Sequence, residues 1–375
     1  MNFELTKEQK MMQKSAVDFA ASTLEPIAYD IDRAAEYPSA AVRAMAEHDF
    51  LGMLIPTEYD GINADYVSVA LVAEAFGKAN AAAAAIAITH AVMAAGAIAK
   101  YGSPELKKKY LPAMAKGEKI GGYALAEPGA ALASGPDKVV AVKDGDKYLL
   151  NGKKFFVLNG GVADVYVVIA QTNEEAGQKG VSAFVVDADD VIVLRSVDKL
   201  GLRAFPTAEI EFKNTKAVLL GAEEDGVKIM NDIQAHADVA FGAMAVGIGQ
   251  AALEASVEHA KTRIQFGNPI GRIQAVQWML AEIATNIHMM KLAVYKAAVA
   301  IQENAEDYIQ QAAFMKMYAM KAGQDAGMNA VQIHGGTGYS REHKIERYFR
   351  DIRGAFHIEN ANEYPQKIIA GSLLK

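Results

Sequence analysis

The sequence predicts an α+β protein of three regions: helical at the N-terminus, rich in antiparallel β-structure in the middle, and helical at the C-terminus. Apolar residues recur at helical spacing in the first 120 positions, short β-branched runs follow up to about residue 222, and long helical patterns then return. We expect domains at 1–120, 121–222 and 223–375. A doubly wound sheet or a βα barrel needs strands that alternate with helices, so both are excluded.

The N-terminal region carries clear signals of helix starts. Thr6 and Gln9 fit a capping box at the start of the first helix. Further helical patterns cover residues 40–51, 67–78, 81–100 and 104–115. The alanine-rich stretch 81–99 is interrupted by Thr89 and His90, which favours a buried helix over a membrane span.

Short apolar runs in the middle region predict strands. They lie at residues 139–142, 148–150, 155–158, 165–170, 181–186 and 210–212. Asp144-Gly145 and Asn151-Gly152 separate such runs and predict hairpin turns, because these dipeptides adopt positive φ angles. We therefore expect a meander of antiparallel strands. In the C-terminal region, helical patterns cover residues 226–262, 272–303, 307–334 and 364–370.

Composition narrows the function classes. A chain of 375 residues with 51% hydrophobic residues can bury a large core, and its net charge of −7 argues against a nucleic-acid binder. The absence of cysteine excludes disulfides, thiolate nucleophiles and cysteine-ligated metals, and we expect no metal site. The first residues lack the apolar segment of a signal peptide, so we expect a mature, cytoplasmic protein without membrane attachment. No dinucleotide-binding glycine motif or phosphate loop is present.

Two motifs in the C-terminal region suit a phosphate-bearing ligand. Arg263 and Phe266, with Gln274 following, offer a guanidinium for a phosphate and a ring that can cover a flat cofactor. The alternative is a turn between helices with a buried Phe. Gln332-Ile333-His334-Gly335-Gly336 is a glycine-dense break after a helix, where backbone can approach a ligand; the alternative is a helix C-cap and a turn.

These motifs, with several others in the same order, resemble the acyl-CoA dehydrogenase family of flavoproteins, in particular its short-chain or butyryl-type and alicyclic members. The other matching segments lie at residues 55–61, 101–103, 123–130, 151–160, 199–203 and 350–351, so the resemblance covers nearly the whole chain. It implies a β-barrel-like middle domain, a C-terminal four-helix bundle and FAD between them. It also implies a homotetramer, in which a neighbouring subunit helps to hold each FAD, and an electron-transfer flavoprotein as electron acceptor.

The resemblance assigns FAD contacts to two groups of residues. One group consists of Arg263, Phe266, Gln274, Gln332, Gly335 and Gly336, and the other of Leu125, Ala126, Phe156 and Leu158. Phe156 stands where the family has a Trp or Phe beside the flavin. Ala126 and Leu158 replace threonines, and Leu132-Ala133 replaces a Ser/Thr-Asp pair. We expect these losses to shift the redox potential of the flavin and to make its surroundings drier.

The family reaction removes a proton α to the thioester while a hydride leaves the β-carbon for flavin N5. The register from Arg350-Asp351 places Glu359 at the position of the base, and we expect Leu132, Ile358 and Asn360 to line the substrate pocket. A carboxylate in an apolar pocket has a raised pKa, which suits it to accept this proton. The alternative is a solvated loop carboxylate.

Asp238 falls where the family commonly has an Arg near the active site. It is either an ordinary acid on the helix surface, or it shares the cavity with Glu359, in which case one of the two keeps its proton and acts as an acid. His90 lies in the alanine-rich helix that lines the acyl end of the pocket in the family, which would leave room for a branched or alicyclic acyl group. The alternative is a buried His bonded to a backbone carbonyl.

We therefore predict an FAD-dependent acyl-CoA dehydrogenase that introduces a Cα–Cβ double bond into a short, branched or alicyclic acyl-CoA thioester. An enoyl-CoA reductase, or a dehydrogenase of carrier-protein thioesters, is an alternative within the same fold. A third alternative is a non-catalytic scaffold subunit of a flavoprotein complex. For Trp278, the only tryptophan, we expect packing in the core.

Overall fold

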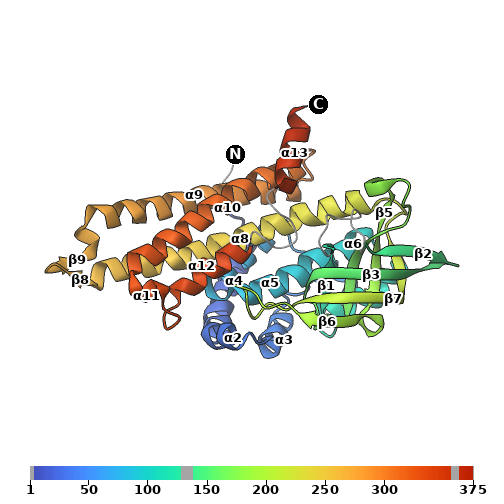
Figure 1. Cartoon of the computed structure of the whole chain (residues 1–375), viewed down its shortest axis with the longest axis horizontal. Coiled ribbons are helices and arrows are strands. Elements are labelled where there is room, and N and C mark those ends of the chain that lie inside the picture. Colours follow the sequence, from blue (N-terminus) through green and yellow to red (C-terminus); the bar gives the residue numbers. More distant parts are fainter. Residues whose placement is uncertain (1–3, 128–137, 356–362, 375) are drawn as a thin grey trace.

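The computed structural model describes residues 4–127, 138–355 and 363–374. Its elements follow the predicted order, with helices first, then a sheet, then a long helical bundle. Figure 1 shows an elongated molecule in which the sheet lies at one end and the tip of the bundle at the other, with the N-terminal helices packed between them against the sheet and the middle of the bundle. The predicted α+β class is thus confirmed.

The N-terminal helices begin close to the predicted starts, except for α2, which was not predicted. Their bounds are α1 Lys7–Phe19, η1 Ala20–Leu24, α2 Ala28–Ala34, α3 Ser39–Glu47, η2 Thr57–Tyr59, α4 Tyr66–Ala79, α5 Ala81–Ile88, η3 Thr89–Ala95, α6 Gly96–Tyr101 and α7 Pro104–Ala115. Thr6 and Gln9 form both hydrogen bonds of the capping box. The Ser103 side chain caps α7, with Pro104 at the first helical position.

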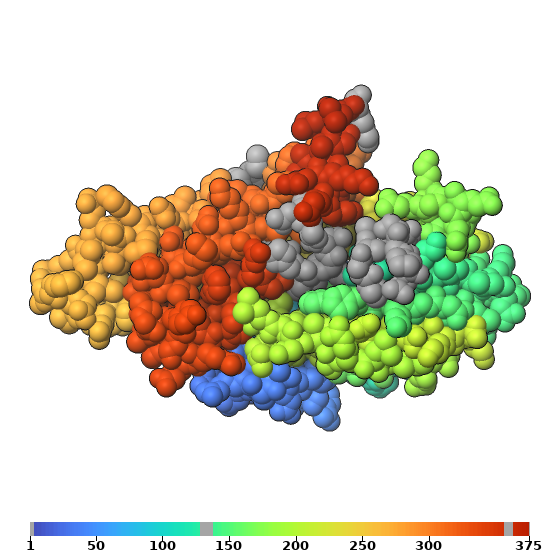
Figure 2. Space-filling view, in the orientation of Figure 1, coloured from blue at the N-terminus to red at the C-terminus, as the bar shows by residue number. Residues whose placement is uncertain are grey.

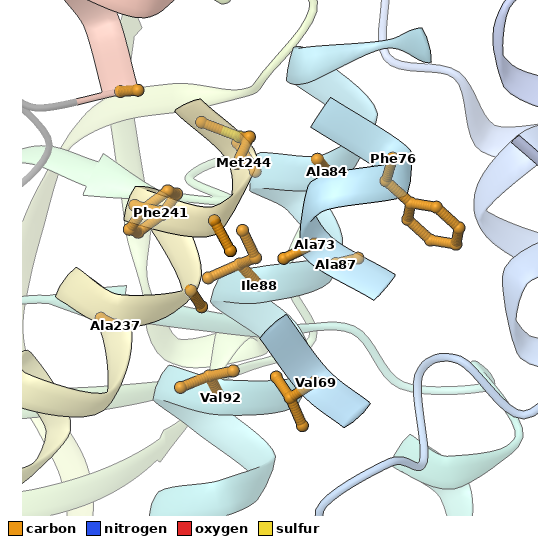
Figure 3. Close-up of a cluster of buried hydrophobic side chains, with 14 of the residues drawn as sticks. Val69, Ala73, Phe76, Ala84, Ala87, Ile88, Val92, Ala237, Phe241 and Met244 are labelled. Atoms are coloured by element: carbon orange, nitrogen blue, oxygen red, sulfur yellow. The ribbon is translucent and has the colours of Figure 1, made fainter. Parts of the chain in front are cut away.

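The core lies where the N-terminal helices meet the bundle. Among the described residues, two stretches are long and apolar enough to cross a membrane, Ala81–Tyr101 and Gly226–Thr262, but 94% and 78% of their most apolar windows are buried inside the fold. Figure 3 shows why: Ile88 and Val92 face Ala237 and Phe241 of the second stretch across a continuous apolar contact. The predicted buried helix at 81–99 is confirmed.

The middle region forms one seven-stranded sheet. Its strands are β1 Gly121–Ala124, β2 Val140–Asp144, β3 Lys147–Leu158, β4 Val165–Gln171, β5 Val181–Asp187, β6 Ile192–Ser196 and β7 Thr207–Leu220. The strand order is β1-β3-β2-β4-β5-β7-β6, with added β1–β4 and β3–β7 pairings that curl the sheet on itself. Most pairs are antiparallel, but β1 runs parallel to β4, so the region is not the simple meander that we expected.

Of the two predicted hairpin turns, one is confirmed and one is wrong. Gly145 has a φ of 63° in the turn between β2 and β3, where Asp144 pairs with Lys147. Asn151-Gly152 instead lies inside β3, at a shift in its register with β7. A Cβ at Gly152 would lie 2.6 Å from the Lys138 carbonyl oxygen, so glycine is required there for a close approach of two backbones rather than for a turn.

The C-terminal region is dominated by three long helices. Its elements are α8 Gly226–Thr262, β8 Ile264–Gln265, β9 Asn268–Pro269, η6 Ile270–Arg272, α9 Gln274–Gln302, α10 Tyr308–His334, α11 Gly336–Tyr339, α12 Ile345–Ala355 and α13 Glu363–Leu373. The β8–β9 hairpin and α12 were not predicted. Figure 2 shows α13 projecting from the body of the chain.

The expectation of a buried Trp278 is wrong. Its side chain on α9 is 60% exposed, and other large apolar side chains on α9 and α10 are also exposed. Examples are Met289, Leu292, Phe314, Tyr318 and Met328. Helical spacing shows that a residue lies on an apolar face, but it does not show whether that face packs within the same chain.

Candidate functional site

Phe156 lines a cavity between the sheet and α12. It lies near the end of β3 with a φ of 60°, which is uncommon for an aromatic residue. The cavity has a volume of about 300 Å³ and its other lining residues include Lys199, Leu200, Leu202, Phe205, Arg350 and Arg353. Leu125 and Leu158 are buried nearby in the core, and Ala126 is half-buried. This cavity combines apolar side chains and an aromatic ring with charged groups at Asp198, Lys199, Arg350 and Arg353, a lining that suits one edge of a flat ring system with polar substituents.

A buried ion pair supports the strand segment that carries Leu125 and Ala126. Lys154 Nζ lies 2.9 Å from Glu127 Oε1 and also donates to the Leu125 carbonyl oxygen at 2.8 Å. Both side chains of the pair are almost completely buried. Glu127 accepts a further hydrogen bond from the backbone N–H of Val139. The pair therefore fixes the backbone at two points, the Leu125 carbonyl oxygen and the Val139 N–H, beside the predicted flavin contacts.

Arg350 and Asp351 anchor α12 to the loop that lines the cavity. The Arg350 guanidinium donates to the Leu200 carbonyl oxygen at 3.0 Å, and Asp351 accepts from the backbone N–H of Leu202 at 2.6 Å. A Cβ at Gly201 would lie 2.1 Å from the Arg350 carbonyl oxygen, so only glycine fits between these contacts. Burial raises the pKa of Asp351 to about 6.

Four predicted site residues lie outside the described residues. They are Glu359, Ile358, Asn360 and Leu132. The catalytic role of Glu359 and the substrate contacts of the other three therefore stay predictions. Arg350 and Asp351, from which the position of Glu359 was counted, are described, and they hold the helix that precedes it.

Asp238 is buried, so the interpretation as an ordinary surface acid is wrong. Its Oδ1 lies 2.7 Å from Lys316 Nζ on α10 and accepts from Gln234 Nε2 one helical turn earlier at 2.7 Å. Burial raises the pKa of Asp238, while the Lys316 ammonium opposes this shift. Whether Asp238 also shares a cavity with Glu359 stays a prediction.

His90 has the structural role that was the alternative to a substrate contact. It is completely buried; its Nδ1 accepts from the backbone N–H of Gly121 at 2.9 Å, and its Nε2 donates to the Met114 carbonyl oxygen at 3.1 Å. Burial lowers the pKa of His90 to about 4, which keeps the ring neutral at pH 7. Neither ring nitrogen is left to contact a substrate.

The second predicted group of FAD contacts gathers at the tip of the bundle. Arg263 ends α8 and Gln274 begins α9, with the β8–β9 hairpin between them, while Gln332, Gly335 and Gly336 lie at the end of α10. Phe266 is 92% exposed with a φ of 51°, so the alternative of a buried Phe in this turn is wrong.

The tip fits the diphosphate and adenosine of a dinucleotide. Arg263 forms no ion pair with any residue that the structure describes, which leaves its guanidinium available for a phosphate. No atom lies within 4 Å of a Cβ built on Gly335 or Gly336, so their backbone is open to a ligand. Figure 1 shows this tip at the end of the bundle away from the sheet. The two predicted groups of FAD contacts are therefore not brought together within one chain.

A cleft of about 550 Å³ opens between the sheet and the helices on another side. Its lining includes Tyr101, Lys179, Lys228, Asn231, Asp232 and Tyr308. The buried Asp232 carboxylate accepts hydrogen bonds from Lys100 Nζ and the hydroxyls of Tyr101 and Tyr308. Two lysines beside a cleft of this size suit a ligand that bears phosphate groups.

Sequence reasoning missed Lys316 and the Asp232 cluster. A signal for Lys316 did exist, because it falls among Ala312, Met315 and Ala319 on the apolar face of a helical pattern. The partners of Asp232 come from positions 76 to 132 residues away, so no local pattern could have shown them.

Comparison with known proteins agrees with this geometry. Three family models match, described as acyl-CoA dehydrogenase N-terminal, middle and C-terminal domains, at residues 6–118, 122–215 and 224–374. The chain is 33% identical to a short-chain-specific acyl-CoA dehydrogenase of Clostridium acetobutylicum, with 100% of both chains covered. It is 35% identical to an acryloyl-CoA reductase (NADH) of Anaerotignum propionicum, covering 100% of this chain and 96% of the relative.

Among solved structures, butyryl-CoA dehydrogenase of Megasphaera elsdenii superposes with a TM-score of 0.95 at 31% identity, with both chains fully covered. The matches extend over all three regions, from the N-terminal helices to the bundle. They support an enzymatic, flavoprotein role and remove the alternative of a non-catalytic scaffold. Fold, domain order and sequence identity together show that this chain is an oxidoreductase of the acyl-CoA dehydrogenase family.

Proposed function

We propose that this enzyme uses FAD to oxidise the Cα–Cβ bond of a short, branched or alicyclic acyl-CoA thioester. The observation that carries the proposal is the cavity between Phe156 and α12, where an aromatic ring, buried apolar residues and the anchored helix before Glu359 meet. Bound flavin would supply the hydride acceptor. Glu359 would take the α-proton, and burial of its carboxylate would raise its pKa toward neutrality.

The CoA portion of the substrate would lie in the cleft beside Asp232. Lys179 and Lys228 line this cleft and can pair with phosphates, while Tyr101 and Tyr308 offer flat surfaces to a pantetheine arm or a base. Asp232 holds both tyrosines through their hydroxyls, so the shape of the cleft is set before the ligand arrives.

The active form would be a homotetramer in which neighbouring copies complete each FAD site. The tip that carries Arg263 lies away from the sheet, so the tip of one copy would serve the flavin of another. Exposed apolar side chains on α9 and α10, Trp278 among them, supply a surface for this assembly. An electron-transfer flavoprotein would then accept the electrons.

The reverse reaction, reduction of an enoyl-CoA, is the second candidate. The 35% identity to an acryloyl-CoA reductase favours it, as does the loss of hydroxyl groups at Ala126 and Leu158. Fewer hydrogen-bond donors around a flavin change its potential and thereby the direction in which it exchanges electrons most readily.

The decisive experiment is an anaerobic titration of the purified protein with a panel of acyl-CoA and enoyl-CoA thioesters, followed by the visible flavin absorbance. We expect yellow protein whose absorbance bleaches with a saturated short or branched acyl-CoA. Glu359→Gln should abolish bleaching, whereas Glu363→Gln, a change in an exposed carboxylate at the start of α13, should not. Colourless protein, or equal bleaching by wild type and Glu359→Gln, would refute the proposal. If no acyl-CoA bleaches the flavin, but an enoyl-CoA oxidises enzyme whose flavin was reduced beforehand, the result would support the reductase.

A further inference from the structure

Lys199 lines the cavity beside Phe156 without a carboxylate partner. It lies half-buried in the connection between β6 and β7, and its Nζ donates to the Phe205 carbonyl oxygen at 2.8 Å. It forms no ion pair with any residue that the structure describes. An ammonium has three N–H donors, so two of them remain for water or for a ligand in the cavity.

The backbone around Lys199 is fixed to α12. The carbonyl oxygen of Leu200 accepts from the Arg350 guanidinium at 3.0 Å, and the N–H of Leu202 donates to Asp351 at 2.6 Å. These contacts hold the connection on both sides of the next residue, Gly201, which packs against the Arg350 carbonyl. The ammonium therefore lies at the cavity wall on a rigid support.

Two other charged residues of the lining are balanced by partners of opposite charge. Arg350 pairs with Asp32 and Glu346. Asp198 pairs with Arg203 at 3.2 Å, and its side chain is 90% exposed. Neither residue therefore supplies a free charge to the cavity.

The remaining charges of the lining are both positive. Among the described residues, Arg353 also has no acidic partner, but it is exposed, so water and salt screen its charge. Burial lowers the pKa of Lys199 to about 8, while Asp198 opposes this shift and Arg203 adds to it. Lys199 is thus still protonated at pH 7 and makes the wall of the cavity positive.

The proposed reaction brings a negative charge to this cavity. A hydride carries two electrons and one proton, so its transfer from the β-carbon leaves a neutral flavin with one negative charge. A fixed cation nearby stabilises that charge and raises the reduction potential of the flavin. Inorganic phosphate from solution offers the ammonium a negative charge as well, and the test below separates the two sources.

We propose that Lys199 stabilises the negative charge of the reduced flavin and thereby favours oxidation of an acyl-CoA over reduction of an enoyl-CoA. This inference rests on the proposed FAD-dependent function and adds a residue that tunes the cofactor. The alternative is that Lys199 only braces its own loop through the Phe205 carbonyl oxygen.

The test measures the reduction potential of the bound flavin at pH 7 by anaerobic equilibration with a reference dye. Lys199→Met removes the charge and should move the equilibrium at least tenfold toward oxidised flavin, which is about 30 mV for two electrons. Lys199→Arg keeps the charge and an N–H donor, and its potential should stay near that of wild type. Lys213→Met is the control, because it removes an exposed lysine that pairs with Glu211 at the surface. Melting temperatures near that of wild type show that the variants fold.

The pH dependence of the potential gives a second measurement that does not need Lys199→Met. Above its pKa the ammonium of Lys199 loses its proton, whereas an arginine stays charged. The potentials of wild type and Lys199→Arg should agree at pH 7 and separate between pH 8 and 10, with wild type the lower of the two. Titration of the flavin itself is common to both proteins and cancels in their difference.

The outcomes separate this inference from the proposed function. Protein that binds no flavin contradicts the proposed function. If flavin binds but Lys199→Met keeps the wild-type potential, or Lys199→Met and Lys199→Arg shift it equally, Lys199 only braces the loop and the inference is overturned. Wild-type and Lys199→Arg potentials that stay equal up to pH 10 also overturn it. If excess inorganic phosphate removes the difference in potential between wild type and Lys199→Met, the ammonium binds an anion from solution instead of serving the flavin.

Discussion

Arg350 and Asp32 form a bidentate ion pair across 318 residues of sequence. Arg350 Nη1 and Nη2 lie 3.1 and 2.7 Å from the two carboxylate oxygens of Asp32, and both side chains are buried. The pair ties α12 to α2 in the N-terminal domain, while the same guanidinium holds the Leu200 carbonyl oxygen beside the Phe156 cavity. One side chain therefore aligns all three domains around the candidate site.

Arg350→Met should lower the free energy of unfolding by about 3–5 kcal/mol, because it leaves the Asp32 carboxylate buried without its cation. Urea denaturation of the two proteins at pH 7 measures the difference. Lys116→Met is the control, since its pair with Asp60 is half exposed and should contribute less than about 1 kcal/mol. If Arg350→Met lowers the free energy of unfolding by no more than Lys116→Met does, Arg350 does not join the domains.

Lys154→Met should also be strongly destabilising, by about 3–5 kcal/mol, because the buried Glu127 carboxylate would lose the ammonium 2.9 Å away that balances its charge. The double variant Lys154→Met/Glu127→Gln removes that charge and should recover part of the loss in a double-mutant cycle. Lys78→Met, which breaks an exposed pair with Glu254, is the matched control. The cycle also needs Glu127→Gln alone. If the losses in unfolding free energy of Lys154→Met and Glu127→Gln add up to that of the double variant, the two residues do not interact directly.

His90 should make unfolding depend on pH below neutrality. Its pKa of about 4 in the folded protein lies below its ordinary value of about 6.5, so the unfolded chain binds more protons between these values. The resulting stability is present above about pH 6.5 and is lost as the pH falls toward 4, by about 3 kcal/mol in total.

His90→Gln should remove this part of the pH dependence of the unfolding free energy, measured from pH 4 to 7. The exposed residue His288 provides the control, and His288→Gln should follow the wild-type curve. Parallel curves for wild type and His90→Gln would show that His90 does not titrate as described.

Asp238→Asn should move one limb of the pH–rate profile if Asp238 and Glu359 share a cavity, because the removal of one carboxylate changes the field at the other. Burial already raises the pKa of Asp238, which brings its titration closer to the assay range. Glu258→Gln, an exposed change on the same helix, should leave the profile unchanged. A wild-type profile for Asp238→Asn would reject the shared cavity.

Leu158→Thr should shift the reduction potential of the bound flavin, since it returns a hydroxyl to a position where the family commonly has one. Leu158 is fully buried at the end of β3, so the change should also cost about 1–3 kcal/mol of stability where the hydroxyl finds no partner. Val157→Thr is the matched control, because successive strand residues face opposite sides of the sheet. Equal potentials in the two variants would place Leu158 away from the flavin.

The sequence by itself determined the order of the three regions, most of the helices and the family. Helix periodicity, the Thr6–Gln9 capping box and the Pro104 helix start depend on residues a few positions apart, and local physics is enough to read them. The break between two long helices at Arg263 was also predicted from local sequence, whereas its role in binding FAD stays a prediction. Asn151-Gly152 failed as a turn since the same dipeptide can also form a bulge when another backbone lies against it.

Only the tertiary structure decided which polar residues are buried together. Lys316 lies 78 residues from Asp238, and Arg350 lies 318 from Asp32, so no local pattern could show which residue pairs with which. Trp278 shows the opposite error, because its helical face is apolar yet lies outside the fold of one chain. Burial is a property of the assembled helices and sheet, and it sets the charge states and pKa values on which the proposed chemistry depends.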